Sequence, residues 1–581
     1  MTTRRIAGTT AGILGALLLL ASGAWWFGES RWGRFEPLTP EQAFADGTLG
    51  LELAPLKYLL VAGTVSRHAL EQQGGPAWPE RFGFLPRSPG AEGRCAADAP
   101  GNLPVGFGVS NRLPGSASPV PVRFVGLTCA ACHSTAVGDG PPILGAGTHT
   151  ADVIGFADAF QNAVLDPGLT AGTILDAYDR QCPGEASGPA GWAGRQVEAF
   201  FIGEWLDGAR TLARLNATKY ELPFHGEEIG DPENIPTGPS RTRPFRSVVR
   251  NVLDLPGDGN VAYSKVPLVA MQENTPWSQF DGSIGDPVVR SMVAVFTSGA
   301  SLAALDDPQI ADNIRKAAAY TLRLGDDPPL PKLAEAFPTL PRPSAETMAR
   351  GRAVYGQHCA ACHGVPDGAH WTVSEPSPGE PSIAPLADIG TDPARMTFRH
   401  ADMLPTALAT LLPATGDDLA AQRQALQDRA GLAARGRDLA QADWWLQAID
   451  RFDARARQFP AGHSLAFDPR KIAMRAGYLN APLPFLWLRA PYLHNGSVPN
   501  LRGLIGLEDR PTRFCRGRAG YDPAAVGLAV VEPVDGHCPP QAGFLFDTEK
   551  PGNSNKGHEY PPRDAVPRPD LEALLAYLGT L

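Results

Sequence analysis

The pentapeptide Cys-Ala-Ala-Cys-His occurs twice in this chain of 581 residues, at residues 129–133 and again at residues 359–363. The chain has only 8 Cys and 12 His, so two copies of one such pattern are not a product of chance. The pattern is the signature of covalent c-type haem attachment. Its spacing puts two thiols and an imidazole on one face of a helical turn, where the thiols reach the two vinyl groups of a porphyrin and the imidazole reaches the iron. The two motifs predict two covalently bound haem c groups.

Each residue of a motif has a predicted role in holding its haem. Cys129 and Cys132 are the expected thioether anchors of the first haem, and His133 is its expected proximal iron ligand. The second haem has the corresponding set Cys359, Cys362 and His363. A zinc site or a thioredoxin-like redox pair is the alternative for each motif. Zinc needs a second ligand pair nearby and a redox pair needs a βαβ context, and the sequence offers neither.

The N-terminal residues 1–35 have the character of a membrane anchor or a signal segment. After two arginines, residues 6–27 carry no charge, and at ~1.5 Å per residue they span ~33 Å, enough to cross a bilayer. Aromatic residues at 25–27 would lie at the interface. Small residues at 21–23 offer signal cleavage as the alternative. We expect a protein on the periplasmic side of the bacterial inner membrane, anchored by residues 6–27, or a soluble periplasmic or secreted protein after cleavage.

Four cysteines lie outside the two motifs. An even number in an oxidising compartment favours disulfides over free thiols, which are the alternative. Pairing Cys95 with Cys182 and Cys515 with Cys538 keeps each bridge within one half of the chain, although the spacing alone does not determine the connectivity.

The composition predicts a mainly α protein with extensive loops. The 63 Gly and 57 Pro require many turns, and the net charge of −10 gives no sign of nucleic-acid binding. A Pro-rich stretch at 326–343 is the expected linker between a first cytochrome c-like haem domain at 36–325 and a second at 344–581. The predicted fold is therefore two cytochrome c-like domains rich in Gly/Pro loops, preceded by an N-terminal transmembrane helix.

The second half begins and ends like a class I cytochrome c domain. Ser344 opens a predicted helix whose apolar residues at 348–355 lead into the motif. Residues 569–570 open a last helix with a leucine stripe at 571–578. In cytochromes c the terminal helices cross beside the haem, and these two could do so. Further helices are predicted over residues 151–165, 191–215 and 417–459.

The segment Ala-Pro-Tyr-Leu-His-Asn-Gly-Ser-Val-Pro-Asn-Leu at 490–501 resembles the motif shared by bacterial di-haem cytochrome c peroxidases and their relatives. Further segments are similar to the branch that includes the bacterial rubber oxygenases. They are residues 104–107, 280–283, 551–559 and, in part, 390–393. The resemblance extends from about residue 40 to the end of the chain. It is specific for the superfamily and only suggestive for a substrate.

The resemblance implies two haems with different tasks. In rubber oxygenases the first haem keeps an open face for dioxygen, while the second is held by two histidines and passes electrons. Carried over to this chain, the haem on His133 is the reactive one, and the haem on His363 takes His558 as its distal ligand. His494 is the rival, since both histidines lie in Gly-containing loops. Met403 or an open position completes the alternatives.

In this family an aromatic residue lies near the reactive haem and helps to couple the two sites. The nearest candidates are Trp277 and Phe280, which with His133 are the candidate catalytic residues. The family pattern favours Trp at the position of Phe280, so the chain departs from it. For Trp277 the alternative is a half-buried core aromatic. A group of arginines also suits haem propionates, with a solvated basic stretch as the alternative: Arg241, Arg243, Arg246 and Arg250.

Two functions are compatible with these features. The first is a haem-dependent oxidoreductase of peroxidase or oxygenase type, in which the first haem activates peroxide or dioxygen and the second relays electrons. The second is a membrane-tethered electron-transfer cytochrome without substrate chemistry of its own. Expected partners are a redox protein or a quinol-linked electron carrier and, through the N-terminal segment, the inner membrane.

Overall fold

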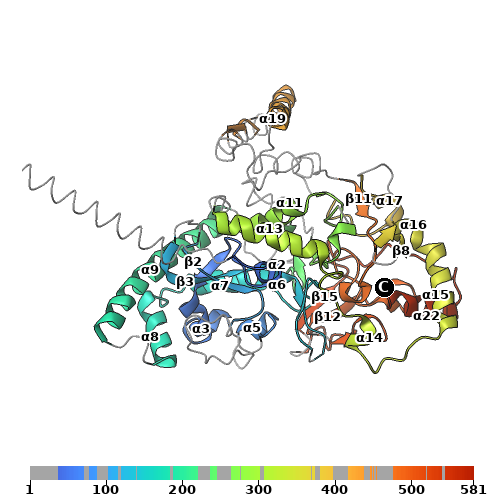
Figure 1. The fold of residues 1–581 in the computed structure, drawn as a ribbon, viewed down its shortest axis with the longest axis horizontal. Helices are drawn as coiled ribbons and strands as arrows, with labels where there is room; N and C mark the ends of the chain where they lie inside the picture. Colours follow the sequence, from blue (N-terminus) through green and yellow to red (C-terminus); the bar gives the residue numbers. More distant parts are fainter. Residues whose placement is uncertain are drawn as a thin grey trace, which may run out of the picture.

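The computed structural model describes most of the chain from residue 37 to the C-terminus. The described residues are 37–70, 78–87, 103–114, 119–138, 140–183, 188–219, 236–244, 263–274, 277–300, 307–367, 370–372, 380–396, 417–436, 442, 445–447, 449–450, 453, 475–518, 520–539 and 543–581. Figure 1 shows the first half of the sequence on one side of the molecule and the last third on the other.

The first half is built on an antiparallel three-stranded sheet. Strand β3 (Pro119–Leu127) lies in the middle, between β1 (Glu52–Pro55) and β2 (Phe107–Arg112). β-Branched and aromatic residues of β3 alternate with the strand period, which suits a half-buried sheet. A Cβ at Gly126 would lie 2.7 Å from the carbonyl oxygen of Leu51, so close backbone approach requires glycine at this position.

Helices cover this sheet and enclose the first hydrophobic core. They are α3 (Leu56–Val65), α7 (Val153–Val164), α8 (Ala171–Gln181) and α9 (Gly188–Lys219). Aromatic side chains fill the space between them, with the ring centroid of Tyr58 5.3 Å from that of Trp205 and 6.0 Å from that of Phe160. The helices predicted over residues 151–165 and 191–215 are confirmed by α7 and α9.

A second core joins both halves of the chain. The helices α2 (Pro40–Ala45) and α13 (Pro308–Arg323) pack together, with the rings of Phe44 and Tyr320 5.1 Å apart. Both rings belong to the same buried cluster as Trp487 and Leu578 from the last third of the chain. The neighbouring helix α11 (Pro287–Thr297) contacts α13. The two halves are therefore held together by shared apolar burial.

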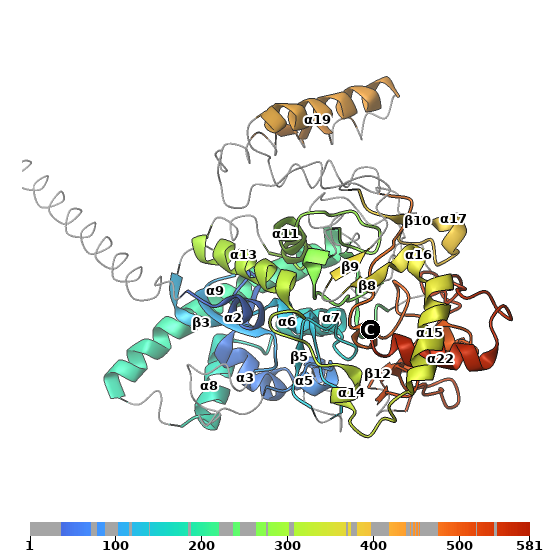
Figure 2. The ribbon, with the colours of Figure 1, turned by 45° about the vertical axis from the view of Figure 1, so that its right-hand side comes forward.

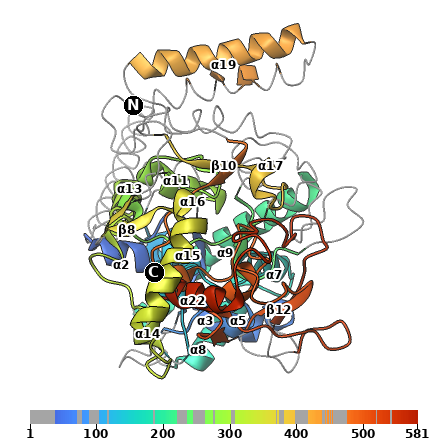
Figure 3. The ribbon, with the colours of Figure 1, turned by 90° about the vertical axis from the view of Figure 1, so that its right-hand side faces the viewer.

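The predicted helices on either side of the second motif are confirmed. Helix α15 (Ala345–His358) is capped by the side chain of Ser344, which accepts a hydrogen bond from the backbone N–H of Thr347 at 3.1 Å. It packs against the last helix, α22 (Arg568–Leu578), as Figure 3 shows. The contact is a backbone approach, because a Cβ at Gly351 would lie 2.1 Å from the carbonyl oxygen of Ala573.

The prediction of a mainly α fold is wrong. Besides the β1–β3–β2 sheet, the structure forms short antiparallel pairs throughout its loops. In the second half these are β8 (Val365–Asp367) with β9 (His370–Thr372), β10 (Ile383–Pro385) with β11 (Gly477–Leu479), β12 (Arg513–Gly517) with β15 (Gly543–Asp547), and β13 (Tyr521–Asp522) with β14 (Gly527–Leu528). These strands are too short to show a clear period-two pattern, and two of the pairs, β10 with β11 and β12 with β15, join segments far apart in the sequence. The helical periodicities therefore dominated the prediction.

The remaining elements are short, except for α19. They are α4 (Arg67–Leu70), α5 (Trp78–Arg81), α6 (Cys129–Cys132), β4 (Ser134–Thr135), β5 (Ile143–Leu144), β6 (Arg241–Thr242), β7 (Ser264–Lys265), η2 (Gln272–Asn274), α14 (Leu333–Ala336), α16 (Ala360–His363), α17 (Leu386–Ile389), α19 (Asp417–Arg435), η5 (Leu486–Arg489) and α21 (Leu501–Leu504). Helix α19 confirms the start of the helix predicted over 417–459.

The predicted transmembrane helix is not supported. None of the helices in the described part of the chain is both long and apolar enough to cross a bilayer. The predicted anchor at residues 6–27 itself lies outside the described residues. The expected linker at 326–343 contains α14, and its Leu330 and Leu333 are buried in the second core. The domain boundaries stay a prediction.

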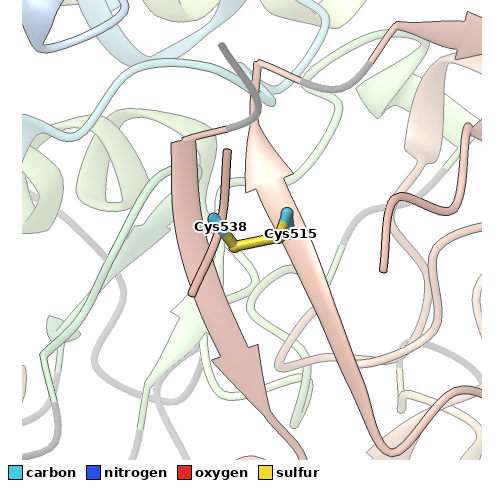
Figure 4. The surroundings of a disulfide bond; sticks show 2 residues. All are labelled: Cys515 and Cys538. Carbon is cyan, nitrogen blue, oxygen red and sulfur yellow. A yellow bond between two sulfur atoms is a disulfide. The ribbon is translucent and has the colours of Figure 1, made fainter. Parts of the chain in front are cut away.

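The predicted disulfide between Cys515 and Cys538 is confirmed. The bond ties strand β12 to the segment that precedes β15, as Figure 4 shows, and closes a sequence separation of 23 residues. Cys182 is buried and disulfide-bonded, whereas Cys95 lies outside the described residues. A disulfide bond agrees with the prediction that the protein lies in an oxidising compartment.

Candidate haem sites

The first motif forms the short helix α6 and ends in His133. The backbone N–H of His133 closes the turn on the carbonyl of Cys129 at 2.9 Å, so both thiols and the imidazole emerge from one turn. Gly106, with φ +84°, lies directly against this turn, because a Cβ there would meet the backbone nitrogen of Ala131 at 2.0 Å. The segment 104–107, on which part of the resemblance rests, thus packs on the motif itself.

The ring of His133 has one nitrogen engaged. Its Nδ1 lies 3.0 Å from the carbonyl oxygen of Pro267, which accepts a hydrogen bond when that nitrogen carries the proton. Burial lowers the pKa of His133 to about 4, so the imidazole is neutral at pH 7. The carbonyl fixes the tautomer that leaves the Nε2 lone pair for a metal, which is the usual arrangement behind a metal-bound histidine.

The second motif repeats this arrangement at the end of α15. Helix α16 carries Cys362 and His363, and the Nδ1 of His363 lies 2.7 Å from the carbonyl oxygen of Ala481. Burial lowers the pKa of His363. The hydroxyl of Tyr355 donates to the carbonyl of Gly364 at 2.8 Å and holds the exit from the motif. Figure 2 shows the two motif helices apart in the molecule, α6 near its middle and α16 at the end of α15.

The residues of both motifs suit covalent haem better than zinc. Burial raises the pKa of Cys129 to about 12 and that of Cys132 to about 11, and it raises the pKa of Cys359 to about 12. A thioether carries no charge and tolerates such burial. The four motif cysteines are not in disulfides. Among the described residues no cluster of three or more His, Cys, Asp or Glu side chains could hold a metal ion by itself.

A second histidine lies opposite His363. The ring centroids of His363 and His558 are 6.0 Å apart, with 40° between their planes. Two metal–imidazole bonds of about 2.0 Å, with each ring centroid about 1.1 Å beyond its nitrogen, place two axial rings about 6 Å apart. Within the described part of the chain neither ring nitrogen of His558 makes a hydrogen bond, and its Nδ1 is buried without a partner. Burial lowers the pKa of His558 to about 4. The pair therefore fits an iron between the two rings.

The loop of His558 is fixed by its backbone. The N–H of His558 donates to the carbonyl of Ile389 at 2.7 Å, and its φ is +50°. Gly557, with φ +79°, packs on Gly390, since a Cβ there would lie 2.3 Å from the carbonyl carbon of Gly390. The guanidinium of Arg510 donates to the carbonyls of Gly557 at 2.8 Å and His558 at 3.2 Å. These contacts bring the similar segments 390–393 and 551–559 together.

His494, the rival ligand, lies in a different environment. Its Nε2 is 3.1 Å from the hydroxyl of Tyr478, and the two rings stack with centroids 4.5 Å apart. Burial first, and then the charges of Arg395 and Lys265, lower its pKa to about 3. No ring contact between His494 and His363 occurs among the residues that the structure describes. Met403 lies outside the described residues.

The two aromatic candidates lie near His494. The ring of Phe280 is half-buried and its centroid is 6.4 Å from that of His494. Trp277 is buried, and the guanidinium of Arg475 lies over its ring at 4.9 Å. Phe280 makes no ring contact with His133 in the described part of the chain. Their catalytic role stays a prediction.

The structure also reveals buried charged residues to which the sequence analysis gave no role. Arg395 and Asp281 form an ion pair of 3.2 Å with both side chains fully buried. Lys265 is buried, with its ammonium on the carbonyls of Arg489 and Pro491. Asp281 belongs to the similar segment 280–283, but no motif marks Arg395 or Lys265, because their partners come from distant segments. Four arginines were offered for propionates, with a solvated basic stretch as the alternative. Of these, Arg241 and Arg243 are buried, while Arg246 and Arg250 lie outside the described residues.

Two family models match this chain. The model described as RoxA-like, cytochrome c-like matches residues 477–515, which include β11, His494 and Cys515. The model described as cytochrome C oxidase, cbb3-type, subunit III matches residues 346–425, which include the second motif. The chain is a c-type cytochrome. The matches imply that this cytochrome carries covalently bound haem c.

Two curated proteins of Sinorhizobium fredii (strain NBRC 101917 / NGR234) are similar to this cytochrome. The first, described as the uncharacterized protein y4iJ, is 28% identical over 86% of this chain and 84% of its own length. The second, the uncharacterized protein y4iM, is 27% identical over 51% of this chain and 56% of its own length. Neither description names an activity. The residues of the haem sites must therefore carry the functional argument.

Proposed function

We propose that this cytochrome is an exported di-haem oxidoreductase, in which the haem on His133 reacts with peroxide or dioxygen and the haem on His363 relays electrons. The observation that carries the proposal is the pair of rings of His363 and His558 at 6.0 Å, with no equivalent ring beside His133 among the described residues. A haem with an open axial position binds dioxygen or peroxide, whereas one with two axial ligands transfers electrons.

The residues around each motif support this division. The carbonyls of Pro267 and Ala481 hold His133 and His363 in the tautomer that binds iron. Arg510 and Gly557 hold His558 opposite His363. His494 keeps a ring nitrogen on Tyr478, which favours His558 as the distal ligand. We further propose that Phe280, beside His494, and Trp277 belong to the aromatic surroundings of the reactive haem.

The proposal includes the location and the partner of the protein. The bond between Cys515 and Cys538 supports export, because disulfides persist in oxidising compartments. Electrons would come from a redox protein or a quinol-linked carrier.

The test is an electron paramagnetic resonance spectrum of the oxidised protein, with His558→Ala and His494→Ala beside the wild type. We expect one high-spin and one low-spin haem in the wild type, and conversion of the low-spin signal to high-spin in His558→Ala alone. His494→Ala is the matched control, since His494 is also buried in a Gly-containing loop. Carbon monoxide should bind one haem per protein. Two low-spin signals without ligand binding would favour a pure electron carrier and contradict the enzyme.

A further inference from the structure

Two buried cations, Lys265 of β7 and Arg516 of β12, lie near the half-buried Arg489 of η5. We call the three together the buried cationic cluster. Burial, and then the charges of Arg489 and Arg516, lower the pKa of Lys265 to about 7. The ammonium of Lys265 therefore lies near both guanidinium groups.

No carboxylate of the described residues forms an ion pair with the cluster. Its hydrogen bonds go to neutral oxygens instead. The ammonium of Lys265 donates to the carbonyls of Arg489 and Pro491, and the Nε of Arg489 donates to the carbonyl of Pro484 at 3.1 Å. A lysine ammonium has three protons and a guanidinium has five N–H groups, so both groups keep unused donors.

Arg516 shows the same shortage of acceptors. Its guanidinium donates to the carbonyl of Gly496 at 3.0 Å and to the hydroxyl of Ser240. Its Nε is buried without a hydrogen-bond partner, and because the residue is only 1% exposed, solvent does not supply one. The acid whose charge acts on it, Asp152, already caps α7 through the N–H of Gly155. Buried charge without a paired anion is costly, so this region favours an anionic ligand.

The cluster borders both motifs. Lys265 lies two residues before Pro267, whose carbonyl holds the ring of His133. The Nε of Arg489 donates to the carbonyl of Pro484, three residues after Ala481, whose carbonyl holds the ring of His363. These contacts place Lys265 near the first haem site and Arg489 near the second.

We propose that the buried cationic cluster binds the propionate carboxylates of the haem groups, with Arg489 serving the haem of the second motif. This inference rests on the proposed pair of haems. Each haem carries two carboxylates, and a carboxylate accepts charge-assisted hydrogen bonds from a guanidinium in a bidentate geometry. The resulting pairs would neutralise the cluster and fix the rotation of each porphyrin about its iron.

Arg241 provides an internal contrast. It is buried in the same region, but all three of its guanidinium nitrogens have acceptors: the carbonyls of Thr237 at 2.6 Å and Pro236 at 3.2 Å, and the side-chain oxygen of Asn553 at 2.6 Å. Arg241 is therefore a structural arginine. It is one of the four arginines that the sequence offered for haem propionates, whereas the unused donors belong to Arg489 and Arg516.

The experiment is a redox titration of the haem-loaded protein, combined with resonance Raman spectra of the propionate bending bands. Arg489→Gln removes the guanidinium charge. The negative charge of the propionate is then uncompensated and stabilises ferric over ferrous iron. We expect a lower reduction potential for the low-spin haem and a shifted propionate band, with the high-spin haem affected less. Arg489→Lys retains the charge and should keep the potential close to that of the wild type.

Arg563→Gln is the control for loss of a positive charge, since Arg563 is 63% exposed and pairs with Asp509. An Arg489→Gln protein with two haems, an intact low-spin signal, and an unchanged potential and Raman band would overturn the propionate assignment alone. One haem per wild-type protein would overturn the proposed function and this inference with it. If Arg489→Gln does not fold, Lys265→Met is tested by the same titration and Raman spectra. An unchanged reduction potential and an unchanged propionate band for both haems in Lys265→Met would also overturn the propionate assignment.

Discussion

The imidazole rings of His363 and His558 lie 6.0 Å apart, although one follows the first helix of the second half and the other precedes the last. Neither ring nitrogen of His558 has another partner among the described residues. The position of this histidine depends on the turn that carries it, and the turn offers a direct test.

Gly557→Ala should displace His558. The new Cβ would lie 2.3 Å from the carbonyl carbon of Gly390, and the φ of +79° disfavours any side chain. We expect a loss of part of the low-spin electron paramagnetic resonance signal. Gly506→Ala is the matched control, because Gly506 has φ +81° and no atom within 4 Å of the added Cβ. Equal low-spin signals in both variants would show that the turn does not position the ligand.

Gly351→Ala should destabilise the contact between α15 and α22. Its Cβ would lie 2.1 Å from the carbonyl oxygen of Ala573, so the helices must separate. We expect a loss of about 1–3 kcal/mol of unfolding free energy, as for other overpacked contacts. Gly356→Ala in the same helix meets no atom within 4 Å and should stabilise the helix by roughly 0.5–1 kcal/mol. Denaturant midpoints measure both effects, and equal midpoints would contradict the close contact.

Replacing both Cys515 and Cys538 by serine should lower stability. The bond closes a sequence separation of 23 residues, for which the chain-entropy model gives about 3 kcal/mol. The denaturant midpoint of the variant should lie below that of the oxidised wild type. Both proteins are compared without reductant, because a reductant would also break the bond of Cys182. If the oxidised wild type and the variant unfold at the same midpoint, the bond does not stabilise the fold.

The buried His149 should make stability depend on pH. Burial, and then the charge of Arg516, lower its pKa from 6.5 to about 4. The unfolded chain therefore binds a proton between pH 6.5 and about 4 that the folded chain does not bind. Stability is fully present above pH 6.5 and falls as the pH drops to about 4, by up to roughly 3 kcal/mol. His149→Gln should flatten the dependence of the denaturant midpoint on pH in this window, and an identical slope in both proteins would contradict the assignment.

The sequence predicted the local features well. The spacing of Cys359, Cys362 and His363 and the cap at Ser344 depend on neighbouring residues, and so the motif and its helix could be placed without tertiary information. The same holds for α22, whose leucines follow the helical period. The mainly α prediction failed because short strands such as β10 and β11 are defined by their pairing across a long separation.

In the candidate sites, too, the sequence predicts local features, while features that depend on distant segments need the tertiary structure. The resemblance gave His558 as the distal ligand and left His494 as the rival, since both lie in Gly-containing loops. The environment separates them: Tyr478 occupies the ring nitrogen of His494, while the ring of His558 faces His363. Lys265 and Arg489 carry no sequence signal, because a buried charge is recognised only by the partners that surround it.

By itself, the sequence determined that this protein attaches haem, since thioether bonds and proximal ligation need only residues at i, i+3 and i+4 of one helical turn. Only the tertiary structure decided which histidine stands opposite His363 and which cations gather between the two motifs. The physical reason is that axial pairing and charge burial depend on distances between segments that the chain folds together from far apart.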